Sequence, residues 1–293
     1  MILFLGYGFI AKALSVKLQQ DNVAHKIISR KKQGNELIVE GDMHDINFVA
    51  SQLKDVSTVV YFAHTTVPYS SMQHIYNDAK ENVLTAIALL EVFAKKGIRV
   101  VYLSSAGSVY GTHSKPVNEQ SLPNPISAYG LSKLTIENYI SLYHKNEGLS
   151  FDTLRLSNIY GLGQLNSKPQ GVISAIADSY VHKKAFKIWG DGKGKKDYLY
   201  IDDLCNALIA VLKVNPSNEV YNISFGTSTS VLEICSIFEK MAGCKLIIEN
   251  APAFIFDVQN TFLDNQKFTE KYSWSPKISI QEGVELTYNW FNR

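Results

Sequence analysis

The first twenty residues place a short apolar run, a glycine-rich turn and a helical pattern in immediate succession. Residues 2–5 are all apolar, as expected for a strand that is buried on both faces of a sheet. Gly6, Gly8 and Ala11 follow as Gly-x-Gly-x-x-Ala, and residues 12–20 show helical periodicity. In this pattern the first glycine permits a tight turn, the second leaves room for a pyrophosphate, and the small alanine lets the helix pack closely. Because the helix N-terminus also attracts anions, this order predicts a dinucleotide-binding unit.

After this unit, expected strands and helices alternate through the first half of the chain. We expect strands at 26–28, 37–39, 56–63 and 100–103, and long helices at about 75–96 and 129–145. This alternation requires right-handed crossovers and predicts an α/β fold with a Rossmann-type, doubly wound parallel sheet. Ligands of such sheets bind at the carboxyl ends of the strands.

Length and composition narrow the class of protein further. At 293 residues, with 46% of them hydrophobic, the chain suits one large domain or two coupled ones. A net charge of +2 gives no case for nucleic acid as a partner. Cys205, Cys235 and Cys244 lack close metal-ligand spacing, so we expect reduced thiols and no metal site. The N-terminal apolar run is too short for a signal peptide, and no run approaches the ~18 residues of a membrane span, so we expect a cytoplasmic protein that engages no membrane.

Tyr129 and Lys133 begin the second long helix and, being four residues apart, share one face of it. A phenol normally ionises near about pH 10, and an ammonium group beside it lowers that pKa. The pair therefore has the chemistry to exchange a proton with a substrate oxygen near neutral pH. The same spacing recurs at 76–80 and 180–184, but only Tyr129 follows a strand that ends in a hydroxyl-rich turn.

That turn contains Ser104, Ser105 and Ser108, directly after the strand at 100–103. A serine hydroxyl, a tyrosine and a lysine at one edge of the sheet form a site that handles an oxyanion beside a nicotinamide. Turn formation is the other role open to these serines, and the convergence of three elements on one edge weighs against it.

The residues after the second strand bear on the choice of cofactor. An acidic residue there binds the ribose 2′-hydroxyl of NAD, whereas this chain has Ser29, Arg30, Lys31 and Lys32. A hydroxyl and three cations suit a 2′-phosphate, so NADP(H) is favoured over NAD(H), and a basic surface loop is the remaining reading. Asp42, after the third strand, stands where a side chain can reach an adenine amino group, and a turn-forming Gly-Asp is an equal reading.

Further motifs accompany these residues along nearly the whole chain. They lie at 6–10, 42, 61–63, 82–83, 103–105, 109–111, 129–133, 154–161, 170–173, 188–192, 196–203, 220–223 and 274–276. Together they resemble the extended short-chain dehydrogenase/reductase family, whose members include nucleotide-sugar epimerases, dehydratases and 4-ketoreductases. The resemblance implies a cofactor domain and a smaller, mixed α/β substrate domain that binds a nucleotide-diphosphate sugar. The first would comprise 1–157 with 195–224 returning to it, and the second 158–194 with 225–293.

The resemblance also implies roles for individual residues. Tyr129 would be the acid/base, Lys133 would hold the nicotinamide ribose and lower the tyrosine pKa, and Ser105 or Ser108 would assist. The substrate would be contacted by Ser105, Ser108, Tyr129, Asn158, Val172 and Lys196. The cofactor would be contacted by Gly6, Gly8, Phe9, Ile10, Ser29, Arg30, Lys31, Asp42, Met43, Phe62, Ala63, His64, Asn82, Ser104 and Lys133.

Family members commonly pair as homodimers through a four-helix bundle, which here would use residues 75–96 and 128–145 of each subunit. Four features depart from the family pattern. The glycine motif is Gly-x-Gly-x-x-Ala in place of the commoner Gly-x-x-Gly-x-x-Gly, and Ala106 stands at the position of the catalytic Ser/Thr, which leaves Ser105 or Ser108 for that role. The other two concern the diphosphate. Lys196 stands where the family often has an arginine on the diphosphate, and Phe254 stands where related sequences carry another arginine. A lysine offers a point charge in place of a bidentate fork, which leaves the diphosphate contact and the nucleotide base open.

Several functions fit these residues. The cations at 30–32 favour an NADPH-dependent reductase of a nucleotide-linked 4-keto-6-deoxyhexose, in bacterial surface-polysaccharide synthesis. A 4-epimerase of the UDP-hexose or UDP-N-acetylhexosamine type, which keeps a tight NAD, is the alternative. A dehydratase is disfavoured, because Ser-Ala-Gly at 105–107 replaces the Thr-Asp-Glu of those enzymes. A non-catalytic NADP-binding sensor is a minor alternative, since such proteins typically lack the Tyr/Lys pair.

Overall fold

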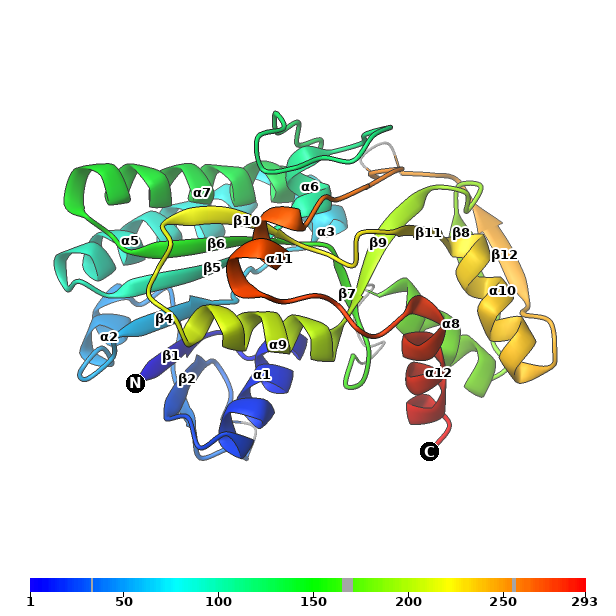
Figure 1. The fold of residues 1–293 in the computed structure, drawn as a ribbon, viewed down its shortest axis with the longest axis horizontal. Coiled ribbons are helices and arrows are strands. Elements are labelled where there is room, and N and C mark those ends of the chain that lie inside the picture. The colour runs from blue at the N-terminus through cyan, green and yellow to red at the C-terminus, as the bar shows by residue number, and fades with distance from the viewer. Residues whose placement is uncertain (33, 165–170, 255–256) are drawn as a thin grey trace.

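The computed structural model describes residues 1–32, 34–164, 171–254 and 257–293, and a parallel sheet dominates it (Figure 1). Within these residues the sheet has seven strands in the order β10-β6-β5-β4-β1-β2-β3, and all neighbours are parallel. The strands are β1 (Ile2–Leu5), β2 (His25–Ser29), β3 (Ile38–Glu40), β4 (Thr58–Tyr61), β5 (Arg99–Ser105), β6 (Phe151–Leu156) and β10 (Glu219–Ile223). The chain order reverses between β1 and β4, as in a doubly wound sheet, which confirms the predicted fold class.

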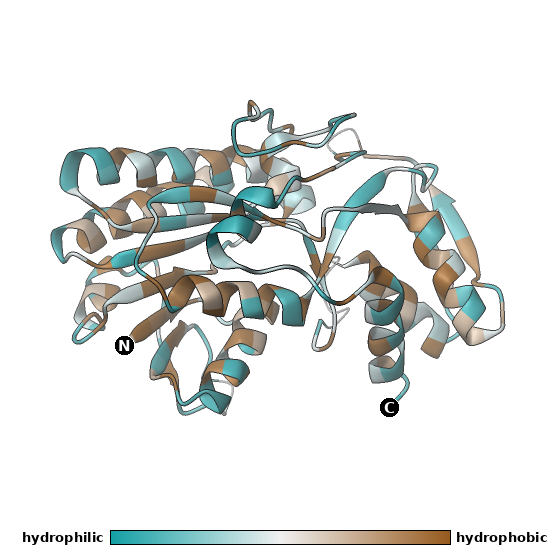
Figure 2. Ribbon diagram, viewed as in Figure 1, coloured by the Kyte–Doolittle hydropathy of each residue, from teal (hydrophilic) through white to brown (hydrophobic). Residues whose placement is uncertain are grey.

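Helices cover both faces of this sheet, because its strands are apolar on both sides. Leu3 and Leu5 pack in one core cluster with Leu89, whereas Phe4 packs in another with Leu14. The first cluster lies under α2 (Ile46–Ser51), α5 (Thr85–Lys95) and α7 (Ala128–Glu147), and the second under α1 (Phe9–Gln20) and α9 (Ile201–Leu212). Figure 1 shows these two layers of helices on opposite sides of the strands, and Figure 2 shows the long hydrophobic stretches of the strands between them.

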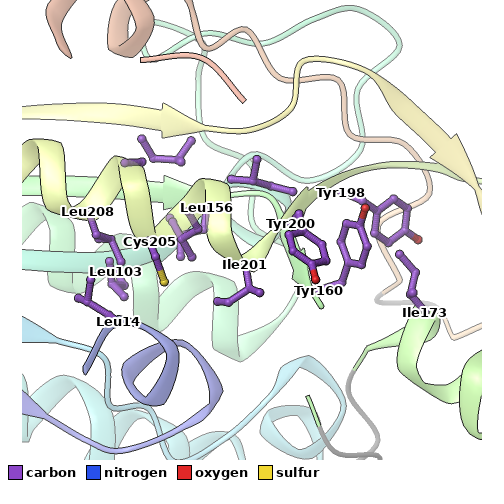
Figure 3. Packing of buried hydrophobic residues seen from close by; sticks show 14 of the residues in the cluster. Leu14, Leu103, Leu156, Tyr160, Ile173, Tyr198, Tyr200, Ile201, Cys205 and Leu208 are labelled. Atoms are coloured by element: carbon purple, nitrogen blue, oxygen red, sulfur yellow. The ribbon is translucent and has the colours of Figure 1, made fainter. Parts of the chain in front are cut away.

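The other part of the chain builds smaller sheets beside the carboxyl edge of the large one. One sheet joins β7 (Asn158–Tyr160), β9 (Lys195–Tyr200) and β11 (Ser228–Ser230), and another joins β8 (Phe186–Trp189) and β12 (Ile248–Ala251). The helices α8 (Val172–Val181), α10 (Val231–Ala242) and α12 (Ile280–Phe291) pack on one another there, whereas α11 (Gln266–Tyr272) packs on β10 and α9. The core is continuous between the parts, since Cys205 and Leu208 of α9 belong to the same cluster as Tyr160, Tyr198 and Tyr200 (Figure 3).

Two local elements differ from the sequence expectation. The helix expected at 75–96 is α4 (Ile75–Asp78), then a π-helix η1 (Ala79–Leu84), then α5, with a separate α3 (Pro68–Gln73) before them. The serine-rich turn is a short helix, α6 (Ala106–Tyr110), which begins directly after β5 and ends at Gly111, whose φ is 75°. The motif residue Gln170 lies outside the described residues, and none of the helices in the described ranges is long and apolar enough to cross a membrane.

An ion pair between Arg99 and Asp152 lies at the amino edge of the large sheet. Arg99 Nε and Nη2 donate to Asp152 Oδ2 at 2.9 and 2.5 Å, and both side chains are buried. We predict that Asp152→Ala lowers the free energy of unfolding by about 3–5 kcal/mol, because the guanidinium is left buried and unpaired. Urea denaturation measures this loss.

The matched control is Glu91→Ala, which breaks the exposed pair between Glu91 and Lys95 on α5. This variant should change stability by less than about 1 kcal/mol, because exposed pairs contribute little. Similar losses in the two variants would contradict the importance assigned to the buried pair.

Candidate active site

Helix α7 presents Tyr129, Lys133 and Glu137 one turn apart on the face toward the sheet. Its first turn is capped by Ser127, whose Oγ accepts from the main-chain nitrogen of Gly130 at 3.2 Å. Lys133 is 3% exposed, and its Nζ donates to the carbonyl oxygen of Leu103 at 2.8 Å. The same Nζ lies 5.7 Å from the centroid of the Tyr129 ring, so the predicted pair is adjacent.

The end of β5 and helix α6 bring both candidate serines, Ser105 and Ser108, to this pair. Ser105 Oγ donates to Ser108 Oγ at 3.1 Å, and Ser105 also hydrogen-bonds the Tyr129 hydroxyl. The structure therefore places Tyr129, Lys133, Ser105 and Ser108 together at the carboxyl end of β5. Ser105 is the hydroxyl in direct contact with the phenol.

Close packing of α6 on α7 depends on Gly130. A Cβ at this position would lie 2.2 Å from the carbonyl oxygen of Ser108 and 3.2 Å from Pro125 Cβ. Only a glycine lets the first turn of α7 approach α6 this closely. The glycine in the Ser-Ala-Tyr-Gly motif thus sets the distance between the serines and the tyrosine.

A buried network fixes α7 against β5 and β6. Glu137 accepts from Arg155 Nε at 3.1 and 3.2 Å and from Nη2 at 2.7 Å, and it also accepts from the hydroxyl of Ser104. Arg155 Nη1 donates to the hydroxyl of Tyr110 at 2.7 Å, and that hydroxyl donates to Asn222 at 3.0 Å. Ser104, expected to contact the cofactor, is therefore engaged in holding the helix.

The electrostatics of the pair differ from the sequence expectation. Burial and, to a smaller extent, the Asp78 carboxylate raise the pKa of Tyr129 to about 12, against the opposing effect of the hydrogen bond with Ser105. Burial also lowers the pKa of Lys133 to about 7, against the opposing charges of Glu137 and Asp78. The net pKa of Tyr129 is therefore raised rather than brought toward neutral, because desolvation outweighs an ammonium that is itself only partly charged near pH 7.

The β1–α1 turn has the shape that a dinucleotide requires. Gly6 has a φ of 98°, and a Cβ there would lie 3.2 Å from Ala63 Cβ, so a larger residue would be strained and crowded. A Cβ on Gly8 would meet no atom within 4 Å, which leaves open space beside the first turn of α1. That turn begins with Phe9 and Ile10, and no side chain caps its free main-chain N–H groups. These groups fit a pyrophosphate.

The other expected cofactor residues lie at the ends of β2, β3 and β4 or on η1. Ser29 ends β2, and the side chains of Arg30 and Lys31 are exposed directly after it. Asp42 Oδ1 accepts from the ring and the main chain of His44 at 2.6 and 3.0 Å. Three more expected residues are at least partly buried: Met43 in the core, Phe62 against Phe4, and Asn82, whose amide bonds Thr65 and Asp78. His64 lies against Tyr129, with 4.6 Å between the ring centroids.

A polar pocket opens beside the serines. It is lined by Pro68, Ser105, Gly107, Ser108, Ser127, Leu156, Ser157, Asn158, Lys196, Asp257, Val258 and Thr261. Lys196 Nζ forms an ion pair with Asp257 at 2.6 Å, and Asn158 Nδ2 donates to a main-chain oxygen at 2.9 Å. Val172, also expected at the substrate, begins α8 and is not among these lining residues.

Phe254, at the position of the absent arginine, stacks on Trp189 with 4.5 Å between ring centroids. Sequence reasoning missed Asp257, since it lies 61 residues from Lys196 and only the fold brings them together. It also missed Asp78 and Glu137. Glu137 did carry a signal, because it continues the spacing of Tyr129 and Lys133 by four residues.

Comparisons with known proteins agree on one family. Residues 2–224 match the NAD dependent epimerase/dehydratase family. The chain is 34% identical to a putative UDP-glucose 4-epimerase of Methanocaldococcus jannaschii, over 97% of this chain and 96% of that protein. It is 26% identical to a dTDP-4-dehydro-6-deoxyglucose reductase of Escherichia coli, over 96% of this chain and 93% of that protein. Among solved structures, a UDP-glucose 4-epimerase from Thermotoga maritima, crystallised with UDP-glucose, matches with a TM-score of 0.93. That match covers 99% of this chain and 98% of the other, at 28% sequence identity.

We predict that Gly130→Ala lowers both stability and any activity of the site. The added methyl group forces α6 and α7 apart, which should reduce the free energy of unfolding by about 1–3 kcal/mol, as overpacking does. Thermal and urea unfolding measure the effect, and Glu285→Ala, at an exposed position of α12, is the control. Native stability in Gly130→Ala would show that the two helices can separate freely.

Proposed function

This chain belongs to the NAD dependent epimerase/dehydratase family, and we propose that it is an NADPH-dependent reductase of a nucleotide-linked 4-keto-6-deoxyhexose. The observation that carries the choice of reaction is the end of β2, where Ser29, Arg30 and Lys31 stand in place of a carboxylate. Exposed cations suit the 2′-phosphate of NADPH, the cofactor that a reductase must exchange at every turnover. The relationship to a dTDP-4-dehydro-6-deoxyglucose reductase supports the same reaction.

In this proposal the cofactor lies along the carboxyl edge of the large sheet. Gly6, Gly8 and the first turn of α1 hold the pyrophosphate, Arg30 and Lys31 hold the 2′-phosphate, and Lys133 holds the nicotinamide ribose. The bound cofactor supplies the hydride. Residues 1–157 and 195–224 form the cofactor side, and residues 158–194 and 225–293 form the sugar-nucleotide side.

The sugar lies in the polar pocket with its C4 carbonyl toward Tyr129. Ser105 donates a hydrogen bond to the carbonyl oxygen, and Tyr129 transfers its proton to that oxygen as the hydride reaches C4, which yields a secondary alcohol. The raised pKa of Tyr129, about 12, keeps the phenol protonated at neutral pH, the form that a proton donor needs. Asn158 and Lys196 face the nucleotide diphosphate from the pocket wall.

A 4-epimerase is the second candidate, and the 34% identity to a putative UDP-glucose 4-epimerase favours it. That reaction uses the same groups twice. Tyr129 first takes a proton from O4 and later returns it, while the ketosugar turns over in the pocket. Such an enzyme keeps its nicotinamide cofactor and shows no net oxidation of it.

We also propose a homodimer that pairs residues 75–96 and 128–145 of each subunit. These helical segments expose large apolar side chains, which is unusual for surfaces that face only water. Leu84 is 60% exposed on η1, and Leu131 is 56% exposed on α7.

The choice of reductase predicts that the purified protein oxidises NADPH when it is given a TDP- or UDP-linked 4-keto-6-deoxyhexose. Absorbance at 340 nm follows the reaction. Arg30→Ala should raise the KM for NADPH at least about tenfold and leave that for NADH nearly unchanged, because it removes a phosphate partner. Lys54→Ala, an exposed lysine at the opposite edge of the sheet, is the control. No NADPH oxidation, together with interconversion of UDP-hexoses, would establish the epimerase instead.

Tyr129→Phe should lower kcat by about 10²–10⁴-fold, because it removes the proton donor while keeping the ring. Cofactor binding, measured by fluorescence titration, should remain close to native. Tyr76→Phe, at an exposed tyrosine of the same Tyr-x-x-x-Lys spacing, should leave kcat unchanged. A non-catalytic sensor would have no turnover to lose, and neither substitution would change its cofactor binding.

A further inference from the structure

Asp78, the last residue of α4, is a buried carboxylate to which the reaction outlined above assigns no role. It is 0% exposed, and its Oδ2 accepts from the hydroxyl of Ser132 on α7 at 2.5 Å. Its Oδ1 accepts from the hydroxyl of Thr66 and, at 3.3 Å, from Asn82 Nδ2. Burial opposes ionisation, but the nearby His64 ring and the hydrogen bonds from Ser132 and Thr66 leave the pKa of Asp78 lowered, so it is charged at neutral pH. A buried charge held this way is costly and needs a reason.

His64 joins this carboxylate to the reactive tyrosine. Its Nε2 lies 3.6 Å from Asp78 Oδ1, and its side chain is 6% exposed. Its ring packs against that of Tyr129, with 4.6 Å between centroids and an interplanar angle of 75°. Burial and the charge of Lys133 lower the pKa of His64 to about 4, against the opposing effect of Asp78. The imidazole is therefore neutral at pH 7 and does not cancel the charge of Asp78.

The backbone around Asp78 is unusual and well held. The π-helix η1 begins at Ala79, and π segments inside helices are frequent at functional sites. Asn82, within η1, donates to the main-chain oxygen of Asp78 at 3.0 Å and accepts from the main-chain nitrogen of Thr65 at 2.8 Å. One amide thus ties α4 to the loop that carries His64 and Thr66.

We propose that Asp78 is a positioning residue for Tyr129. Through His64 it supports the tyrosine ring, and through Ser132 it fixes the first turns of α7. Its negative charge also disfavours ionisation of the phenol. This deepens, and rests on, the function proposed above, in which Tyr129 is the proton donor.

The sign of the charge effect follows from the groups that face Tyr129. Asp78 from α4 disfavours the phenolate, and Lys133 from α7 favours it. His64 is neutral, Ser105 from β5 hydrogen-bonds the phenol, and the buried Tyr102 of β5 has a raised pKa and stays neutral. Glu137, further along α7, is paired with Arg155. Removal of the Asp78 charge should therefore lower the pKa of Tyr129.

The test is a titration of protein labelled with ¹³C at the tyrosine ζ carbon, in which the chemical shift reports ionisation of each phenol. Tyr129→Phe identifies the Tyr129 signal by its loss. Asp78→Asn removes the charge and can keep an oxygen toward Thr66 and Asn82, while its NH2 group faces Ser132, whose hydroxyl can turn to accept from it. We expect the ratio of phenolate to phenol at Tyr129 to rise about tenfold at about pH 10.5, which corresponds to a pKa about one unit lower.

Asp152→Asn is the matched control, because it neutralises another buried carboxylate at the opposite edge of the sheet. It should reduce stability and leave the titration of Tyr129 unchanged. A Tyr129 midpoint that is the same in Asp78→Asn and the native protein would overturn the proposal. The titration does not require turnover, so its result is independent of whether the proposed reaction is correct.

His64→Gln tests the ring support and leaves Asp78 in place, so it does not depend on whether Asp78→Asn folds. The glutamine keeps an amide near Asp78 but has no ring against Tyr129. We expect kcat to fall about tenfold, because the orientation of the Tyr129 phenol is lost. The KM for the nucleotide sugar should stay within about twofold of the native value. A native kcat in this variant would overturn the role of His64. Absence of turnover in the native protein as well would instead refute the proposed reaction.

Discussion

The buried ion pair between Glu137 and Arg155 fixes the helix on which the candidate site depends. Glu137 lies on α7 two turns beyond Tyr129, and Arg155 lies near the carboxyl end of β6, the strand beside the edge strand β10. Their contacts of 2.7–3.2 Å leave neither charge unpaired, and a single unpaired charge at this depth would cost several kcal/mol. Any rotation or sliding of α7 would break these contacts. The direction of the Tyr129 side chain is thus held by an interaction remote from any substrate.

The same burial shapes the charges around the pair. Lys133 donates to a main-chain oxygen and lies between the rings of Tyr102 and Tyr129, so burial lowers its pKa to about 7 despite Glu137 and Asp78. Glu137 is already paired with Arg155, whereas Asp78 faces a neutral imidazole. Asp78 is therefore the carboxylate whose charge acts on the tyrosine with the least local compensation. Desolvation, rather than the ammonium, decides the proton affinity of Tyr129.

Sequence patterns predicted the elements whose cause is local. The apolar run of β1 follows from burial on both faces, and the positive φ of Gly6 follows from its place between strand and helix. The Tyr129 and Lys133 spacing placed both side chains on one helical face. Asp78 escaped prediction, because its role arises from packing against Ser132, 54 residues away, and from a π-helix that has no simple sequence pattern. The raised pKa of Tyr129 escaped for a related reason, since spacing does not reveal desolvation.

The protonation of Tyr129 matters to either reaction considered for this site. A reductase uses the phenol as a proton donor, and a raised pKa makes the phenol a weaker acid although it stays protonated at neutral pH. An epimerase uses the phenolate in its first step and the phenol in its second, so both reactions need Tyr129 to exchange a proton. A charged Lys133 beside the phenol would ease either transfer, and the burial of Lys133 opposes that charge. The groups around Tyr129 therefore serve either reaction, and the exposed cations after β2, which would act on the cofactor, are the feature that distinguishes the proposed reductase.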